Sequence, residues 1–380
     1  MDRPSCRCWR FLGLLLVGFV MPAVFNAVSS KPAGFSSLNG GTLATSETDR
    51  ALITLTLRIP KLTEPIPGLV IAGVDKGGTS EAWAMIAHEF QAQTQCHRHK
   101  ELGCLYKYRQ GAVAVEDCYK SCFNLSLVQN SSNYLPVDGT PSYLYGGLNL
   151  EAKPVSPATL FKFSPEAAVL FLLRKPLDRA RSLYNHWCKA SSTRPPPIRA
   201  GCESSLESLL STELQFLHDN DYLVKQFLNA SCINRSDCDL WSPMWQYRTG
   251  FEPSIKAGQR KHGRRKHRHP YILTGMYFPF VYAWAQCTKA KQLAVMQSEY
   301  FWQDPRRLWT VLGVSSDYVP LQPQNKANAY TARATLSPTV AKQIEDAFKE
   351  PTELLRSYLL IQNSSIIVVP SVSNTTWWPK

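Results

Sequence analysis

A glycine-rich turn between an apolar run and a helical pattern is the first segment suited to chemistry. Gly68–Ala72 are a continuous apolar run, Gly73–Thr79 contain three glycines and one lysine, and apolar residues from Trp83 to Phe90 then repeat at helical spacing. The backbone N–H groups of such a turn and the positive end of the next helix bind phosphate-like anions, and Lys76 adds a point charge. The turn is not a Walker A loop, because Lys76 precedes the glycine pair. An ordinary turn with an exposed lysine is the alternative.

A second turn suited to an anion follows the apolar run Ala167–Leu173. Arg174 comes directly after this run, and Ser182 lies eight residues later, about two turns into the expected helix, so both could face one anion. A solvated arginine is the alternative for this turn taken alone. Two such turns at strand ends of one sheet favour a shared anion site.

Buried strands that alternate with helices would position these turns. Continuous apolar runs predict strands at Gly68–Ala72, Ala167–Leu173 and Leu293–Met296. Helices are expected after the first two strands, and two more are expected to begin at the N-cap and proline pairs Asp304–Pro305 and Ser337–Pro338. The alternation predicts an α/β fold with a parallel sheet flanked by helices, in which ligands bind beyond the carboxyl ends of the strands.

Several segments resemble motifs of the Golgi carbohydrate sulfotransferases, particularly those of the heparan sulfate type. Gly73–Ser80 is similar to the family's 5′-phosphosulfate loop, and Arg174–Ser182 is similar to its 3′-phosphate motif, an Arg-x-Pro followed by a serine. Asp138–Leu144 resembles the Thr-Pro-x-Tyr segment between them, and parts of the stretch from Tyr282 to Val314 resemble a later strand and helix. The resemblance covers about residues 66–360 and implies a P-loop-like sulfotransferase fold.

The resemblance implies transfer of a sulfuryl group from 3′-phosphoadenosine 5′-phosphosulfate (PAPS) to a hydroxyl or amine of a polysaccharide or glycoprotein glycan. Such transfer is catalysed by positioning and by neutralising the charge that grows on the leaving oxygen, so it requires no metal. Carried over residue by residue, the resemblance makes Lys76 catalytic and implies that PAPS is bound by Lys76, Gly77, Gly78, Thr79, Ser80, Arg174 and Ser182.

The resemblance also implies a glutamate that takes the acceptor proton. Residues 99–106 are most similar to the family segment that carries this base, which makes Glu101 the expected base. His97 or His99 could do the same work.

Two departures from the family pattern fall near this site. Gly103–Cys104 stand where the heparan sulfate enzymes have an aromatic pair, and Gly139 stands where they often carry lysine. The second departure bears on the acceptor contacts more than on the donor site.

The N-terminus predicts a membrane signal. Three arginines precede the uncharged apolar run of residues 11–28, which as a helix is long enough for a thin bilayer and would leave its positive flank cytosolic. A type II signal anchor is favoured over a signal peptide cleaved near residue 30. We therefore expect a single-pass Golgi membrane protein with a cytosolic tail (1–10), an anchor (11–28), a stem (29–65), a luminal sulfotransferase domain (66–362) and a C-terminal tail (363–380).

Glycosylation sequons and cysteines agree with a luminal position. Six Asn-x-Ser/Thr sequons begin at Asn124, Asn130, Asn229, Asn234, Asn363 and Asn374. Two of the 11 cysteines precede the apolar run, which leaves an odd number in an oxidising lumen, so that one would stay unpaired or pair between chains. The sequence does not fix the connectivity; local candidates are Cys118 with Cys122, Cys188 with Cys202, and Cys232 with Cys238.

The charge balance points to an anionic partner. With 44% hydrophobic residues the chain can fill a core, which excludes global disorder, and 42 Lys and Arg against 29 Asp and Glu leave a net charge of +13. A basic run, Lys256–His269, could bind an anionic polysaccharide or form a solvated insertion, whereas the luminal setting argues against nucleic acid. A protein-tyrosine sulfotransferase and a catalytically inactive polyanion-binding protein of the same fold are the alternatives. The oligomeric state does not follow from the sequence.

Overall fold

The structure is a computed structural model that describes residues 56–92, 94–96, 100–131, 133–145, 157–186, 205–229, 270–316, 318, 335–362 and 365–369. The strands are β1 Leu69–Gly73, β2 Val137–Asp138, β3 Ala168–Leu173, β4 Leu293–Gln297 and β5 Ile366–Val369. The α-helices are α3 Thr79–Glu89, α4 Ala112–Cys122, α5 Leu125–Asn130, α6 Pro157–Phe163, α7 Pro176–Tyr184, α8 Leu206–Asp219, α9 Asp221–Leu228, α12 Phe278–Ala285, α13 Ser298–Gln303, α14 Arg307–Leu312 and α15 Pro338–Ile361. Three 3-10 helices are η1 Cys104–Gln110, η2 Pro141–Tyr145 and η7 Leu273–Gly275.

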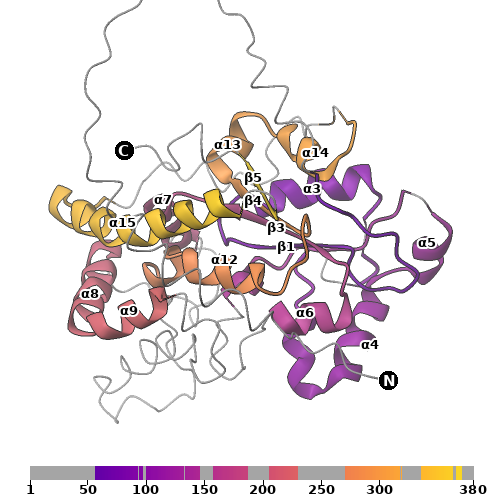
Figure 1. Cartoon of the computed structure of the whole chain (residues 1–380), viewed down its shortest axis with the longest axis horizontal. Helices are drawn as coiled ribbons and strands as arrows, with labels where there is room; N and C mark the ends of the chain where they lie inside the picture. The colour runs from indigo at the N-terminus through magenta and orange to yellow at the C-terminus, as the bar shows by residue number, and fades with distance from the viewer. Residues whose placement is uncertain are drawn as a thin grey trace, which may run out of the picture. The chain divides into compact units, whose positions relative to one another are not determined.

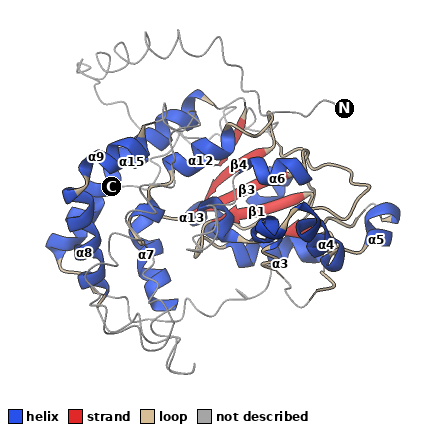
Figure 2. Cartoon of the chain, turned by 90° about the horizontal axis from the view of Figure 1, so that it is seen from below, coloured by secondary structure: helices blue, strands red, loops and turns tan. Residues whose placement is uncertain are grey.

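The five strands form one parallel sheet in the order β2-β1-β3-β4-β5. Val70 of β1 lies opposite Val169 of β3, and Val169 lies opposite Leu293 of β4. Figure 2 shows β1, β3 and β4 side by side, with helices around them. The predicted parallel α/β sheet and its three predicted strands are confirmed, whereas the short strand β2 and the last strand β5 were not expected from the sequence.

Both faces of the sheet are buried, which explains why its strands are continuous apolar runs. In β3, Val169 and Phe171 point to one core, and Leu170 and Leu172 point to the other. Side chains of α3, α13 and α14 fill the second core, and those of α4, α6, α7, α8, α12 and α15 fill the first. Figure 1 shows α3, α13 and α14 on one side of the strands, with α12, α6 and α4 on the other. The glycine-rich turn and the helix after it therefore rest on a rigid layer.

The two helix starts that the sequence predicted have different outcomes. Ser337 caps α15, since its hydroxyl accepts a hydrogen bond from the backbone N–H of Val340, as predicted. The start at Asp304–Pro305 was wrong by two residues, since the N-cap of α14 is Arg306. The Asp304 carboxylate accepts hydrogen bonds from the backbone and side chain of Arg306 and closes a separate turn, so α14 begins at Arg307.

The folded domain extends past both boundaries expected from the sequence. Leu57, expected in the stem, is buried in the second core, and its N–H donates a 2.7 Å hydrogen bond to the Val311 carbonyl. At the other end, β5 lies in the expected C-terminal tail and pairs with β4. The boundaries at 65 and 362 are therefore corrected, because sheet pairing and core packing continue beyond them.

The expected membrane anchor and several other predicted features lie outside the described residues. They are the cytosolic tail, the anchor, the stem up to residue 55, the basic run Lys256–His269 and the cysteines at 188, 202, 232 and 238. Within the described ranges, no helix has both the length and the apolar character required to span a bilayer.

Candidate functional site

The order of the strands brings the two anion-suited turns together. β1 and β3 are adjacent and parallel, and in the order β2-β1-β3 the chain switches direction across the sheet between them. The turns that follow β1 and β3 therefore leave the same edge, where open α/β sheets bind ligands. The Val74 N–H donates to the Leu172 carbonyl at 3.0 Å, so the first turn starts directly against the end of β3.

The glycine-rich loop (Gly73–Ser80) packs closely against the backbone at the end of β3. A Cβ atom at Gly77 would lie 2.3 Å from the Leu172 carbonyl oxygen, so only glycine fits there. Gly78 has φ 89°, and Lys76 has φ 68°, which is uncommon for a residue with a side chain. The Gly77 N–H donates to the Val74 carbonyl at 2.9 Å and closes the turn. The loop thus needs its glycines where the sequence has them.

The glycine-rich loop ends at the positive end of helix α3. Gly78 is the N-cap and has no side chain to accept from the first turn, and the first helical bond runs from Ala82 N–H to the Gly78 carbonyl. The N–H groups at the start of a helix lack partners within it and attract anions. The hydroxyl groups of Thr79 and Ser80 stand at this same turn. The arrangement can bind a phosphate or sulfate group through backbone and side-chain donors together.

Arg174 joins the second turn to the glycine-rich loop. Its Nη1 donates to the Lys76 carbonyl at 3.1 Å, and its guanidinium lies 4.8 Å from the centre of the Trp302 ring. The Tyr277 hydroxyl donates to the Arg174 carbonyl at 2.8 Å, and the Ser298 hydroxyl donates to the Gly77 carbonyl at 2.6 Å. Arg174 Nε is buried and has no hydrogen-bond partner in the described part of the chain. Arg174 therefore contacts the backbone of the glycine-rich loop at Lys76.

The cations of the site are partly removed from water. Burial is the largest cause that lowers the pKa of Lys76, and the charge of Lys100 lowers it further against the opposing effect of Asp75. Burial also lowers the pKa of Arg174. The pKa of Asp75 is raised, first by burial and then by the charge of Glu101. Desolvated cations of this kind gain stability from a bound anion.

Glu101, the expected base, lies beside the glycine-rich loop. Its side chain is 58% exposed and accepts a 3.3 Å hydrogen bond from Lys100 Nζ. The same Nζ donates to Thr79 Oγ1 and to Ser80 Oγ, each at 3.0 Å. The structure thus brings Glu101 to the anion site through a lysine to which the sequence reasoning gave no role.

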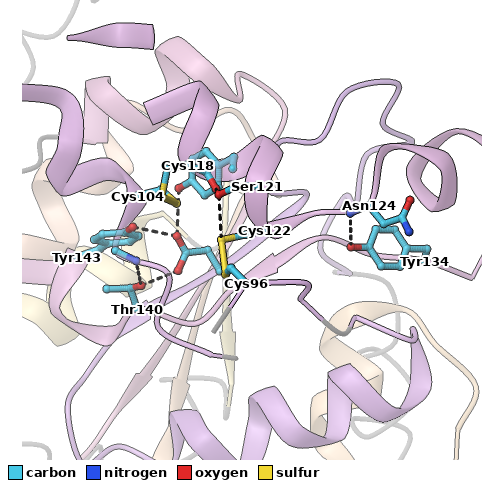
Figure 3. The surroundings of a disulfide bond; sticks show 12 residues. Cys96, Cys104, Cys118, Ser121, Cys122, Asn124, Tyr134, Thr140 and Tyr143 are labelled. Atoms are coloured by element: carbon cyan, nitrogen blue, oxygen red, sulfur yellow. Dashed lines mark hydrogen bonds between the residues drawn. A yellow bond between two sulfur atoms is a disulfide. The ribbon is translucent and has the colours of Figure 1, made fainter. Parts of the chain in front are cut away.

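Two disulfides fasten the chain on either side of Lys100 and Glu101 to helix α4. Cys96 is bonded to Cys122, and Cys104 is bonded to Cys118 (Figure 3). The candidate pair Cys118 with Cys122 is therefore not formed. Residues four apart lie on one face of a helix, and both cysteines on that face of α4 bond to cysteines that precede the helix.

A buried hydrogen-bond network, in addition to the disulfides, holds residues 100–105. These residues are named the 100–105 segment. The Gly103 N–H donates to Thr140 Oγ1 at 3.0 Å, and the Leu105 N–H donates to the Tyr143 hydroxyl oxygen at 3.1 Å. Both partners in turn donate to the carboxylate of Asp138, at 2.6 and 2.9 Å. Figure 3 shows Thr140 and Tyr143 with their hydrogen bonds as dashed lines. Burial raises the pKa of Asp138 to about 6 against these hydrogen bonds. The Thr-Pro-x-Tyr segment therefore supports the chain that carries Glu101.

The remaining predicted residues are placed less fully. Ser182 is half-buried in α7, and within the described ranges no side-chain hydrogen bond joins it to Arg174. His97 and His99 lie outside the described residues.

Sequence reasoning also missed the parts that Lys100 and Trp302 play in the site. Lys100 could have been noticed as a cation next to the expected base. No local pattern marks Trp302, which reaches the site only because α13 follows β4.

Comparison with known proteins gives little beyond this geometry. No family model matches the sequence, and no curated protein matches it. Among solved structures, the chain is similar to the sulfotransferase from Alicyclobacillus acidocaldarius, with 18% identity and a TM-score of 0.43 over 77% of this chain and 95% of that one. A likeness of this degree does not by itself assign an activity, so the functional conclusion depends on the site.

Proposed function

We propose that this chain is a sulfotransferase that uses PAPS to sulfate a hydroxyl or amine of a polysaccharide or glycoprotein glycan. The observation that carries the proposal is the hydrogen bond from Arg174 to the Lys76 carbonyl. It joins two anion-suited turns at the switch point of a parallel sheet. A donor with anionic groups at both its 5′ and its 3′ position requires such a pair of turns.

The residues present fit PAPS. The glycine-rich loop and the start of α3 would hold the 5′-phosphosulfate through backbone N–H groups, Lys76, Thr79 and Ser80. Arg174, whose Nε has no partner in the described chain, would hold the 3′-phosphate together with Ser182. PAPS supplies an activated sulfuryl group; the protein binds, orients and neutralises charge.

The transfer needs one proton acceptor and one site of charge neutralisation. A lone pair of the acceptor oxygen or nitrogen forms the new bond to sulfur, while the bond from sulfur to the bridging phosphate oxygen breaks and its electron pair stays on that oxygen. Lys76 and the loop N–H groups neutralise the charge that develops there. Glu101 takes the proton that the acceptor loses. The products are the sulfated glycan and 3′-phosphoadenosine 5′-phosphate (PAP).

The proposed setting is the Golgi lumen, with the chain held by its N-terminal anchor. The two disulfides support an oxidising compartment. The net charge of +13 supports an anionic acceptor. The same features would suit a polyanion-binding protein without activity, so binding of the donor is the deciding property.

Calorimetry of PAP with the full-length chain tests the proposal. We expect a dissociation constant on the order of micromolar for the wild-type chain and a large loss of affinity in Arg174→Ala. The matched control is Arg306→Ala, because Arg306 is an exposed arginine bonded to Asp304 in its own turn. Absence of PAP binding by a folded wild-type chain would contradict the proposal.

Transfer of labelled sulfate from PAPS would then identify the acceptor. Heparan-type and chondroitin-type polysaccharides, a glycoprotein glycan and a tyrosine peptide should be compared as acceptors. Labelling of a glycan would support the proposal. Labelling of the peptide alone would replace it with protein-tyrosine sulfation.

A further inference from the structure

Lys100 occupies a place in the site that the resemblance does not assign. Its ammonium group is within 3.0 Å of the hydroxyls of Thr79 and Ser80 and within 3.3 Å of a Glu101 oxygen. Its side chain is only 15% exposed, whereas a lysine is ordinarily solvated. The cation therefore lies at the start of α3, where the proposed function puts the sulfated end of the donor.

The charges around Lys100 favour an anion between it and Lys76. The charge of Lys100 disfavours the charged form of Lys76 and contributes to the lowered pKa of Lys76, after the larger effect of burial. The nearby carboxyl groups are those of Asp75, Glu81 and Glu101, which offset part of this repulsion. An anion bound between two cations gains from both charges and removes their repulsion.

The position of Lys100 is built into the surrounding chain. The Gly139 N–H donates to the Lys100 carbonyl at 2.9 Å. A Cβ atom at Gly139 would lie 2.8 Å from Lys100 Cγ and 3.0 Å from Trp83 Cδ1. The absence of a side chain at Gly139 thus leaves the space through which the Lys100 stem reaches the glycine-rich loop.

We propose that Lys100 is a second catalytic cation that binds the sulfuryl oxygens of PAPS. This inference rests on the proposed function. Lys76 neutralises the leaving phosphate oxygen, and Lys100 holds the transferring group and exchanges its contacts with Thr79 and Ser80 for contacts with that group. Lys100 forms and breaks no covalent bond and keeps its proton throughout.

The difference between PAPS and PAP isolates this role, because PAP has the same phosphates but lacks the sulfuryl group. Calorimetry of the full-length chain should show that Lys100→Met weakens PAPS binding by about tenfold and changes PAP binding by less than about twofold. Lys100→Arg should restore part of the lost PAPS affinity. The control Lys120→Met, at an exposed lysine paired with Glu116 on α4, should change neither affinity.

The possible results distinguish a failure of the proposed function from a failure of the role proposed for Lys100. A wild-type chain that does not bind PAP contradicts the proposed function itself. A wild-type chain that binds PAP, with a Lys100→Met variant that loses PAPS and PAP affinity equally or loses neither, overturns the role of Lys100 alone. Thermal unfolding of each variant shows that the chain is folded when binding is measured.

A second variant tests the role without removing the lysine. Gly139→Ala should displace the Lys100 stem and reproduce the selective loss of PAPS affinity. When it is combined with Lys100→Ala, the alanine at 139 should add little further loss, since there is no stem left to displace. Additive losses in the double variant would overturn the proposal.

Discussion

The glycine-rich loop and the 100–105 segment form two sides of one site, yet different interactions hold them. The loop lies between a strand and a helix, and its shape follows from glycines next to the β3 backbone. The 100–105 segment begins irregular, enters a 3-10 helix, and is held by two disulfides and by side chains around Asp138. The side proposed to bind the donor, the donor side, is thus encoded locally, while the side that carries the expected base depends on distant parts of the chain.

The largest loss of activity is expected on the donor side, from Lys76→Ala. Turnover should fall by about 100- to 1000-fold, because a preorganised group that neutralises the leaving oxygen is removed. Initial rates of sulfate transfer measure this loss. The midpoint of thermal unfolding should stay close to that of the wild-type chain, and unchanged turnover would remove Lys76 from the reaction.

Gly77→Ala should damage the same side through its backbone. The new Cβ would meet the Leu172 carbonyl, so we expect a loss of about 1–3 kcal/mol in the free energy of unfolding together with weaker PAP binding. Urea unfolding and calorimetry measure the two effects. The control is Gly68→Ala, whose Cβ would meet only the side-chain ends of Leu135 and Leu62, which can move. Equal effects at both glycines would argue against a special loop geometry.

Removal of one disulfide should lower turnover while leaving PAP binding nearly unchanged. In the double variant Cys104→Ser with Cys118→Ser, turnover should fall by about tenfold, since small displacements of a reacting group are costly, while PAP affinity stays within about twofold. Both cysteines are replaced because a single thiol would lie near the sulfur of Cys122. Parallel losses of turnover and PAP affinity would show that the two sides are not independent.

The last expected effect concerns stability alone and is a pH dependence that comes from Asp138. Its carboxyl group titrates near 3.8 when the chain is unfolded and near 6 when it is folded, so the folded chain binds more protons between these values. The free energy of unfolding should therefore fall as pH rises from about 4 to about 6, by up to about 1.4 kcal/mol per pH unit.

Urea unfolding across this pH range, with Asp138→Asn alongside, measures the contribution of Asp138. The variant should lose this part of the slope. An identical slope in both chains would show that Asp138 does not change its protonation on folding.

Much of the donor side could be predicted from the sequence, because its signals are local. The apolar run before Gly73, the glycines and the helical spacing after them predicted the strand, the turn and α3 in the right order. The run before Arg174 did the same for β3 and α7. The sequence pattern failed to predict β2, because this strand has only two residues, and it misplaced the start of α14, because Arg306 is the N-cap of that helix.

The other side of the site could be predicted only in part. Glu101 was placed near the donor by resemblance, but nothing in the sequence indicates that Lys100 reaches Thr79 and Ser80. The sequence left the disulfide connectivity open for a related reason. Spacing favours the neighbours Cys118 and Cys122, while the orientation of α4 decides which sulfur atoms meet.

The sequence by itself determined the parallel α/β class, the three inner strands and the two anion-suited turns, because burial on both faces and backbone conformation leave local patterns. Only the tertiary structure decided that β1 and β3 are adjacent, that Arg174 bonds the Lys76 carbonyl, and that Lys100 passes over Gly139 to the glycine-rich loop. These contacts join residues far apart in the chain. Such contacts depend on how strands pair and how helices pack, and no local pattern of residue types predicts that pairing and packing.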